Sequence, residues 1–340
     1  MPRRRVLAGL AGAGVAAAAG ALAQKRLLAA IAADPEAERL RRPLAGEVLD
    51  VSGNDGNRLH AEAFGPADAP KLLLVHGWMC SIEFWRYQID ELAGDFRVIA
   101  YDHRGHGRSD QAADYSFDEF ADDLGCVLEA VAPGERVVAA GHSMGAMTIA
   151  AWAGRHPAEV ENRLSACLLA NTGLGDLIME SVVLKTPERL TGFRDPVGRL
   201  LMGAAVPLPA SPSPVGDAAV RYIAMNPDAT PARVAMVRRM VLSHNPKVRA
   251  AAGRTMAEMD LWHALESLDV PATVLVGGAD KMTPPAQSRR LAEALPDVVD
   301  LVELPGVGHM APIEAPEGVN AAIRGVAAAQ RASAPALSAL

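Results

Sequence analysis

Short apolar runs alternate with longer helical stretches from Gly46 onward, and this alternation leaves few architectures open to the chain. Runs that are apolar at successive positions are typical of strands buried on both faces, as in a parallel sheet. Such strands separated by helices predict an α/β layered domain with right-handed crossovers. The predicted strands cover residues 47–52, 59–65, 71–75, 97–101, 136–140, 166–170, 272–276 and 298–304, and the predicted helices include 117–131, 144–155 and 286–295.

One segment interrupts the alternation. Residues 173–262 contain no convincing strand, and their Pro-rich and amphipathic stretches predict a helical cap lying over the sheet. The expected organisation is therefore a core of residues 44–172 and 263–330, this cap, and a flexible tail of 331–340. Methionines suit irregular apolar spaces, so those of the cap would either line a substrate pocket or pack the cap onto the core. Seven of the thirteen methionines lie there: Met179, Met202, Met225, Met236, Met240, Met256 and Met259.

The region from residue 1 to residue 43 has a different character from the rest of the chain. Arg3, Arg4 and Arg5 precede a stretch from Val6 to Ala23 that contains no charged or polar side chain. Basic residues ahead of a weakly apolar segment resemble a twin-arginine export signal, and a segment of this length just suffices to span a bilayer. We expect an export signal or membrane anchor followed by a polar linker, with possible membrane association through this segment. The alternative is an Ala-rich helix of a cytoplasmic protein.

The composition excludes several other classes. A net charge of −7 without long basic runs argues against a nucleic-acid partner. The three cysteines share no C-x-x-C spacing, so neither a disulfide framework nor a zinc ribbon is expected. No pair of histidines has the spacing of metal ligands on one element. We therefore expect no metal and no cofactor.

The predicted strand at 136–140 leads into the most informative motif of the chain. It is followed by G-x-S-x-G, formed by Gly141, Ser143 and Gly145, and then by a helix that opens at Met144. This order is that of a nucleophile elbow, in which a sharp strand-to-helix turn lifts a serine hydroxyl clear of the sheet. The helix N-terminus then points at the negative charge that develops during reaction. Ser143 is the predicted nucleophile.

A serine nucleophile needs a base, and the base needs an acid to orient it. His309 lies on a glycine-rich loop directly after the last predicted strand. In open α/β sheets the functional residues lie on the loops that follow the carboxyl ends of the strands. Asp280 emerges at the end of the predicted strand 272–276, which makes the chain order Ser, Asp, His. The rival acids Asp260 and Asp269 follow no strand. His76, His106 and His142 also lie near strand ends, but each precedes the serine.

An oxyanion hole requires backbone N–H donors rather than side chains. Met144, the residue after the nucleophile, is the first expected donor. The second is expected from Trp78, in the loop after the strand 71–75, because Gly77 allows that loop to approach the turn closely. The Trp78 side chain has core packing as its alternative or additional role.

Five short motifs are spread along the chain: H-G-W at 76–78, Y-D-H-R-G-H-G-R-S at 101–109, G-H-S-M-G at 141–145, G-x-x-D ending at 280 and G-H at 308–309. Taken together, they resemble the α/β-hydrolase fold superfamily in its cap-bearing serine hydrolase branch. The resemblance covers about residues 46–328 and implies a mostly parallel eight-stranded sheet flanked by helices, with a helical cap insertion. It also implies that Asp102 and Arg104 organise their loop and take no part in chemistry.

The same branch is similar to esterases, non-haem haloperoxidases, carbon–carbon bond hydrolases and epoxide hydrolases. Epoxide hydrolases of the superfamily carry Asp where this chain has Ser143, so the serine indicates acyl transfer and a small or lipophilic ester as substrate. Perhydrolase or haloperoxidase-like chemistry and carbon–carbon bond hydrolysis remain alternatives with the same triad. Hydrolysis of a carbon–carbon bond in a dienoate acid would need cap cations, for which the candidates are Arg189, Arg194, Arg233 and Arg238.

Overall fold

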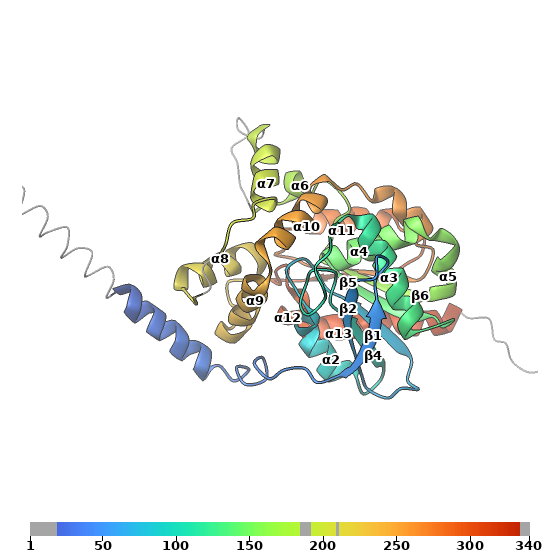
Figure 1. The fold of residues 1–340 in the computed structure, drawn as a ribbon, viewed down its shortest axis with the longest axis horizontal. Helices are drawn as coiled ribbons and strands as arrows, with labels where there is room; N and C mark the ends of the chain where they lie inside the picture. The colour runs from blue at the N-terminus through green and yellow to red at the C-terminus, as the bar shows by residue number, and fades with distance from the viewer. Residues whose placement is uncertain (1–18, 184–191, 209–210, 334–340) are drawn as a thin grey trace, which may run out of the picture.

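The computed structural model describes residues 19–183, 192–208 and 211–333 (Figure 1). An eight-stranded sheet forms the centre, with the strand order β1-β2-β4-β3-β5-β6-β7-β8. β2 pairs antiparallel with β1 and with β4, and all other pairs are parallel, which confirms the predicted mostly parallel sheet. The strands are β1 (Glu47–Ser52), β2 (Arg58–Phe64), β3 (Lys71–Val75), β4 (Arg97–Tyr101), β5 (Val137–His142), β6 (Leu164–Ala170), β7 (Ala272–Gly277) and β8 (Val298–Leu304).

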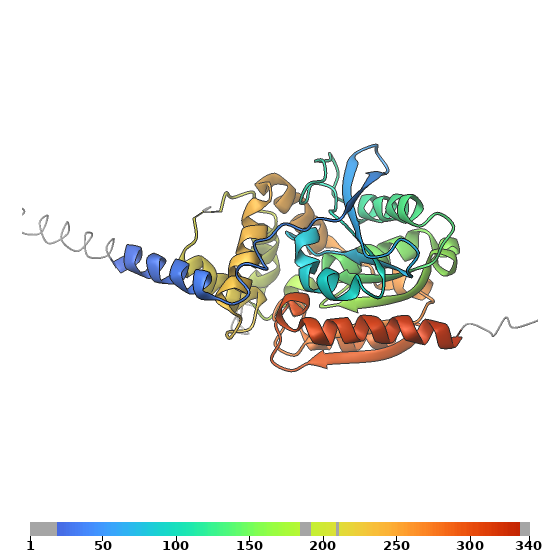
Figure 2. The same ribbon diagram turned by 90° about the horizontal axis from the view of Figure 1, so that it is seen from below.

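Helices cover both faces of the sheet. Successive side chains of a strand point to opposite faces, so Leu73 and Val75 of β3 belong to one apolar cluster and Leu72 and Leu74 to another. The first cluster includes α3 (Phe117–Val131), α4 (Met144–Arg155) and α11 (Pro285–Ala294). The second includes α2 (Arg86–Leu92) and α13 (Pro316–Ser333), the red helix of Figure 2. Shorter helices are α5 (Val160–Arg163) and α12 (Ala311–Glu314), with 3-10 turns at Ile82–Trp85, Pro157–Glu159 and Trp262–Ser267.

The environment of β8 differs from the expectation. Its apolar run predicts burial on both faces, but Val298, Val299 and Leu301 are all exposed. β8 stands at the end of the strand order, so only β7 pairs with it. Asp300 and Glu303 interrupt its apolar pattern, and such charges are common on edge strands.

Between β6 and β7 the structure describes five α-helices and no strand, within residues 173–262. These helices stand at one end of the sheet (Figure 1). Three of their starts are encoded locally: Ser213, Thr230 and Asn245 each precede a proline at the first helical position and cap the helix with a side-chain oxygen. The helices are α6 (Leu177–Glu180), α7 (Arg194–Met202), α8 (Pro214–Ala224), α9 (Pro231–Ser243) and α10 (Pro246–Glu258).

The methionines of this insertion mostly pack its helices onto the core. Met225, Met236, Met240 and Met256 are buried within the two apolar clusters, whereas Met179 is exposed. Arg189, one of the candidate cations, lies outside the described residues, as do residues 1–18 and the tail from 334.

The N-terminal region is more closely attached than a polar linker. Residues 19–33 form a helix, and residues 34–44, which we call the strap, run across the surface to β1. Leu40 is only 2% exposed, and Ala37 and Leu44 are also buried. The charged residues that suggested a linker lie between these apolar contacts. Within the described part of the chain, no helix has the length and apolar character needed to cross a membrane.

Candidate active site

Ser143 occupies the turn between β5 and α4. Its backbone dihedrals are φ 52° and ψ −119°, a strained conformation for a residue with a side chain, and the residue is 7% exposed. Met144 begins α4 directly after it. This is the geometry expected of a serine held above the sheet edge on a strand-to-helix turn.

The two flanking glycines are required by close backbone approach. A Cβ on Gly141 would lie 2.6 Å from the backbone nitrogen of Ala146. A Cβ on Gly145 would overlap the carbonyl oxygen of Val75 on the neighbouring strand. Side chains at these positions would therefore force α4 away from the sheet and open the turn.

Asp280 and His309 come together from the loops that follow the adjacent strands β7 and β8. Nδ1 of His309 lies 2.8 Å from Oδ2 of Asp280, and because the carboxylate can only accept, Nδ1 carries the proton. Thr283 donates to the same carboxylate twice, through its hydroxyl to Oδ2 at 2.8 Å and through its backbone N–H to Oδ1 at 3.0 Å. All three side chains are buried.

Asn171 is a member of this cluster that the sequence analysis did not select. It follows β6 with a left-handed φ of 48°, and its Nδ2 donates to Asp280 Oδ2 at 2.9 Å and to the Gly308 carbonyl at 3.2 Å. The amide thus ties the acid to the loop that carries His309. Its position in the sequence could have identified it. Asn171 is a polar residue directly after the predicted strand 166–170, and the other residues of the cluster also follow the ends of neighbouring strands.

The hydrogen bonds around Asp280 keep it ionised. Burial raises the pKa of this carboxyl group, but the charge and hydrogen bond of His309, the Asn171 amide and the Thr283 N–H together outweigh burial, so the pKa is lowered from its ordinary value. Asp280 is therefore a carboxylate at neutral pH, and it orients the His309 imidazole with Nε2 available as a base.

His142 joins the Ser143 turn to the His309 loop. Its Nε2 donates a hydrogen bond to the His309 carbonyl at 2.8 Å, and the two rings lie 4.9 Å apart. Burial, with a contribution from His309, lowers the pKa of His142 to about 3, so the ring is neutral. Among the described residues Ser143 and His309 make no hydrogen bond with each other. Contacts of this kind are often long without substrate and tighten when it binds.

The loop after β3 approaches the Ser143 turn closely. A Cβ on Gly77 would lie 3.2 Å from Cβ of Ser143, and the loop is closed by Cys80 N–H donating to the Gly77 carbonyl at 3.1 Å. The backbone N–H groups of Trp78 and Met144 have no hydrogen-bond partner within the described chain. The Trp78 indole donates to the Arg249 carbonyl of α10 at 3.1 Å, so this loop also contacts the insertion.

Asp102 and Arg104 have the contacts of structural residues. Asp102 accepts from the backbone N–H groups of Ile82 and Arg108, each at 2.8 Å. Arg104 forms a two-point ion pair with the buried Asp123, at 2.7 and 2.8 Å. Their carboxylate and guanidinium groups are thus occupied in holding their loop.

The other histidines near strand ends have packing roles. His76 Nδ1 and His106 Nδ1 contact backbone carbonyls at 2.8 and 3.0 Å. Burial, followed by the charges of neighbouring histidines, lowers the pKa of both rings well below the ordinary value. Neither histidine contacts Asp280.

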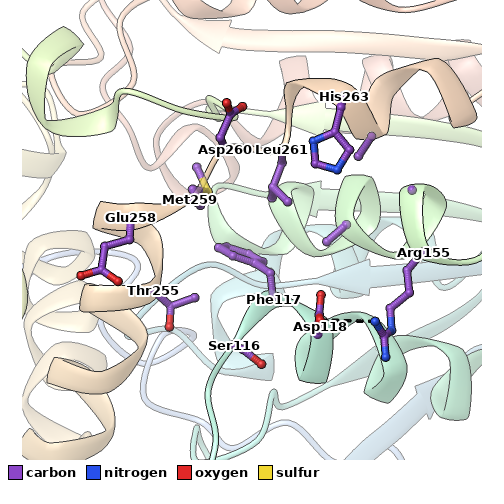
Figure 3. Close-up of a pocket in the computed structure, with 13 residues that line it drawn as sticks. Ser116, Phe117, Asp118, Arg155, Thr255, Glu258, Met259, Asp260, Leu261 and His263 are labelled. Atoms are coloured by element: carbon purple, nitrogen blue, oxygen red, sulfur yellow. Dashed lines mark ion pairs between the residues drawn. The ribbon is translucent and has the colours of Figure 1, made fainter.

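A surface cleft of about 530 Å³ is lined by none of Ser143, Asp280 and His309 (Figure 3). It is formed by the start of α3 and the ends of α4 and α10, and Asp118 and Arg155 form an ion pair of 3.3 Å in its wall. Asp260, one of the rival acids, lines it, and its carboxylate accepts from the Trp262 backbone N–H, whereas His309 pairs with Asp280. The other rival, Asp269, is exposed. Across residues 19–183, 192–208 and 211–333, no group of three His, Cys, Asp or Glu side chains could hold a metal ion.

Known proteins with similar sequences share this fold. The model of the alpha/beta hydrolase fold family matches residues 70–316, a range that contains Ser143, Asp280 and His309. The chain is similar to a bifunctional esterase/perhydrolase of Acinetobacter calcoaceticus, at 27% identity over 282 residues that cover 79% of this chain and 96% of the relative. It is also similar to a non-heme chloroperoxidase of Burkholderia pyrrocinia, at 26% identity over 272 residues that cover 76% and 92%.

A solved structure also shares the fold of this chain. A thermophilic esterase from Thermogutta terrifontis is 26% identical and superimposes with a TM-score of 0.66, covering 84% of this chain and 99% of its own. The sheet order, the strained serine between β5 and α4, and the family match over more than half of the sequence lead to one conclusion: the chain belongs to the α/β-hydrolase fold family.

Proposed function

We propose that this protein is a serine hydrolase that cleaves a carboxylic ester through an acyl-enzyme on Ser143. The observation that carries the proposal is the strained Ser143 turn and its link to His309. His142 joins this turn to the His309 loop, and Nδ1 of His309 donates to the ionised Asp280. The similarity to an esterase/perhydrolase and to an esterase of known structure supports the ester as the substrate class.

The proposed reaction begins when Nε2 of His309 removes the hydroxyl proton of Ser143 as its oxygen attacks the ester carbonyl. Asp280 stabilises the imidazolium that forms. The unpaired N–H groups of Trp78 and Met144, within the described chain, are suited to donate to the oxyanion of the tetrahedral intermediate. His309 then protonates the leaving alcohol, and water releases the acyl group by the same route.

The insertion between β6 and β7 is the proposed cap over this site. The Trp78 indole bonds to Arg249 of α10, and Met225 lies beside the His309 loop, where the backbone N–H of His309 donates to the Ala224 carbonyl at 2.9 Å. Both proposed reaction loops therefore contact insertion helices, so movement of α8 or α10 would change access to Ser143.

The proposal is tested with the full-length protein and p-nitrophenyl esters of increasing acyl length, with Ser143→Ala as the control. We expect hydrolysis that peaks at one chain length, and a loss in the variant of at least about 10³-fold, since the nucleophile is removed and only oxyanion and binding effects remain. A Ser143→Ala protein that keeps most of its turnover would contradict the mechanism. The full-length protein is used because residues 34–44, the strap, pack on the body.

Perhydrolysis is the second candidate function, and the similarity to an esterase/perhydrolase and to a chloroperoxidase favours it. Hydrogen peroxide would replace water at the acyl-enzyme and release a peracid. Bromination of a dye that requires both peroxide and acetate, and that is absent in Ser143→Ala, would identify this activity. Carbon–carbon bond hydrolysis would need a free cation in the insertion; Arg233 pairs with Glu36 and Arg238 with Asp217, which leaves Arg194 as the described candidate without an ion pair.

A further inference from the structure

Exposed apolar side chains are concentrated in the insertion between β6 and β7. Single exposed apolar residues are normal on a soluble protein, but contiguous groups of them mark interaction sites. Of the seventeen large apolar side chains exposed in the described chain, eleven lie between residues 179 and 223. They are Met179, Val182, Phe193, Val197, Leu200, Leu201, Val206, Leu208, Val215, Tyr222 and Ile223.

Two helices of the insertion turn an apolar stripe outward. Along α7, the stripe has the spacing i, i+4, i+7, i+8, and Leu200 within it is 70% exposed. Along α8, the spacing is i, i+3, i+4, i+7, i+8, and Val215 within it is 80% exposed. An apolar stripe at helical spacing ordinarily faces the core, so these two are inverted. We call them the outer stripes: Phe193, Val197, Leu200 and Leu201, and Val215, Ala218, Ala219, Tyr222 and Ile223.

The helix over residues 19–33 projects from the body beside part of the insertion. Figure 1 shows it at the lower left, below α8, while α7 stands at the top of the view. Ile31 is its only buried residue, Gln24 and Leu27 are half-buried, and its other residues are exposed. In the sequence it continues the uncharged run that begins at Val6.

The strap holds this helix in a fixed direction relative to the insertion. Asp34 accepts from the Ala232 N–H at the start of α9, at 2.9 Å. Glu36 forms a two-point ion pair with Arg233 of α9, at 2.7 and 3.0 Å. Tyr87 of α2 donates to Glu36 at 2.6 Å, which joins the strap to the core as well. The N-terminal helix, α9 and the core are thus connected at one point.

Charge distinguishes the kinds of surface that could cover the outer stripes. Residues 1–33 contain no Asp or Glu and five cations, among them the exposed Lys25 and Arg26, whereas the whole chain carries −7. The described cations Lys25 and Arg26, together with the exposed apolar helices, match an anionic lipid surface, where apolar side chains enter the acyl boundary and basic ones meet the headgroups. A second copy of the chain is a less suitable partner. In a symmetric dimer the cations of the two copies would face each other and repel.

We propose that the outer stripes of α7 and α8 are a membrane-docking surface that rests on an anionic phospholipid bilayer, with the helix over residues 19–33 also contacting the lipid. This surface places the insertion, and with it the approach to Ser143, against the lipid. The docking does not depend on the reaction proposed above.

The test uses the full chain in vesicles of phosphatidylcholine and anionic phosphatidylglycerol in a two-to-one ratio, with a Cys126→Ala background because Cys80 and Cys167 are buried. A bimane fluorophore is attached at Leu200→Cys or at Val215→Cys, and lipids with spin-labelled acyl chains serve as quenchers. The matched control is Val299→Cys, an exposed apolar position on β8. We expect quenching of at least about twofold at both test positions and none at the control, because interfacial helices bury their apolar face about 5–10 Å deep.

Three outcomes would overturn the proposal. Equal, weak quenching at all positions would mean that the stripes do not touch lipid. Emission that changes with protein concentration in detergent would assign the stripes to contact between copies. Labels that are not quenched but shift the preferred ester chain length would place the stripes in the substrate pocket. Hydrolysis of p-nitrophenyl acetate by each labelled variant reports folding and separates failure of docking from failure of the proposed reaction.

Discussion

Asp280 receives five hydrogen bonds, and they decide what a substitution there would do. In Asp280→Asn the charge is lost and the amide can donate to His309, so the imidazole would take the wrong tautomer. We expect kcat to fall by about 10⁴-fold, as for the orienting acid of other serine triads. Ester hydrolysis at neutral pH checks this, and a fall below tenfold would exclude the orienting role.

The same substitution has a pH signature in stability. The folded pKa of Asp280 is lowered from 3.8, so the carboxylate contributes stability that is present above the unfolded pKa and is lost as the pH falls through the folded value. The difference in unfolding free energy between wild type and Asp280→Asn should therefore be largest at neutral pH and shrink below about pH 4. Urea unfolding at pH 7 and pH 3 measures it; a difference independent of pH would contradict the assignment.

His142 is predicted to position the base rather than to transfer protons. His142→Phe removes the donor to the His309 carbonyl, and loss of one hydrogen bond of about 1 kcal/mol corresponds to a roughly five- to tenfold lower kcat. His142→Gln keeps an N–H donor and should recover part of the rate. Because the pKa of His142 is about 3, the pH profile above pH 5 should keep its shape in both variants. A change in KM alone would argue against positioning.

At the scale of elements, the strand-to-helix turn depends on how closely α4 approaches β3. Gly145→Ala places a Cβ against the Val75 carbonyl, and we expect a loss of at least about 2 kcal/mol in unfolding free energy, because backbone must move. Gly94→Ala is the matched control, since a Cβ there meets nothing within 4 Å, and its effect should stay within about 0.5 kcal/mol. Similar urea midpoints for the two variants would contradict this view of the turn.

At the scale of the whole molecule, the strap joins the insertion to the core. Its Leu40 is buried, and the Leu40 carbonyl accepts from Arg239 of α9 at 2.8 Å. Leu40→Ala should cost about 2–5 kcal/mol, the range for buried leucines that leave a cavity. Leu28→Ala, at an exposed site on the N-terminal helix, should change stability by less than about 0.5 kcal/mol. Thermal unfolding of both variants tests whether the strap is part of the folded body.

Local patterns in the sequence predicted most elements of the fold and the three residues proposed for the reaction. The strand at 71–75 is predicted and observed with the same bounds, and the glycines around Ser143 specify a turn that the structure contains. These signals are local, because apolar periodicity and glycine spacing act within a few residues of the chain. The order of Ser143, Asp280 and His309 is likewise readable without the fold.

The side chains that support those positions could be identified only from the folded structure. Asn171 reaches Asp280 across 109 residues of sequence, and His142 reaches the His309 carbonyl across 167. The burial of Leu40 and the exposure of β8 also depend on neighbours that are distant in the chain. The local sequence shows whether a side chain is apolar or polar. Which other side chain it contacts depends on how the strands and loops are arranged in space.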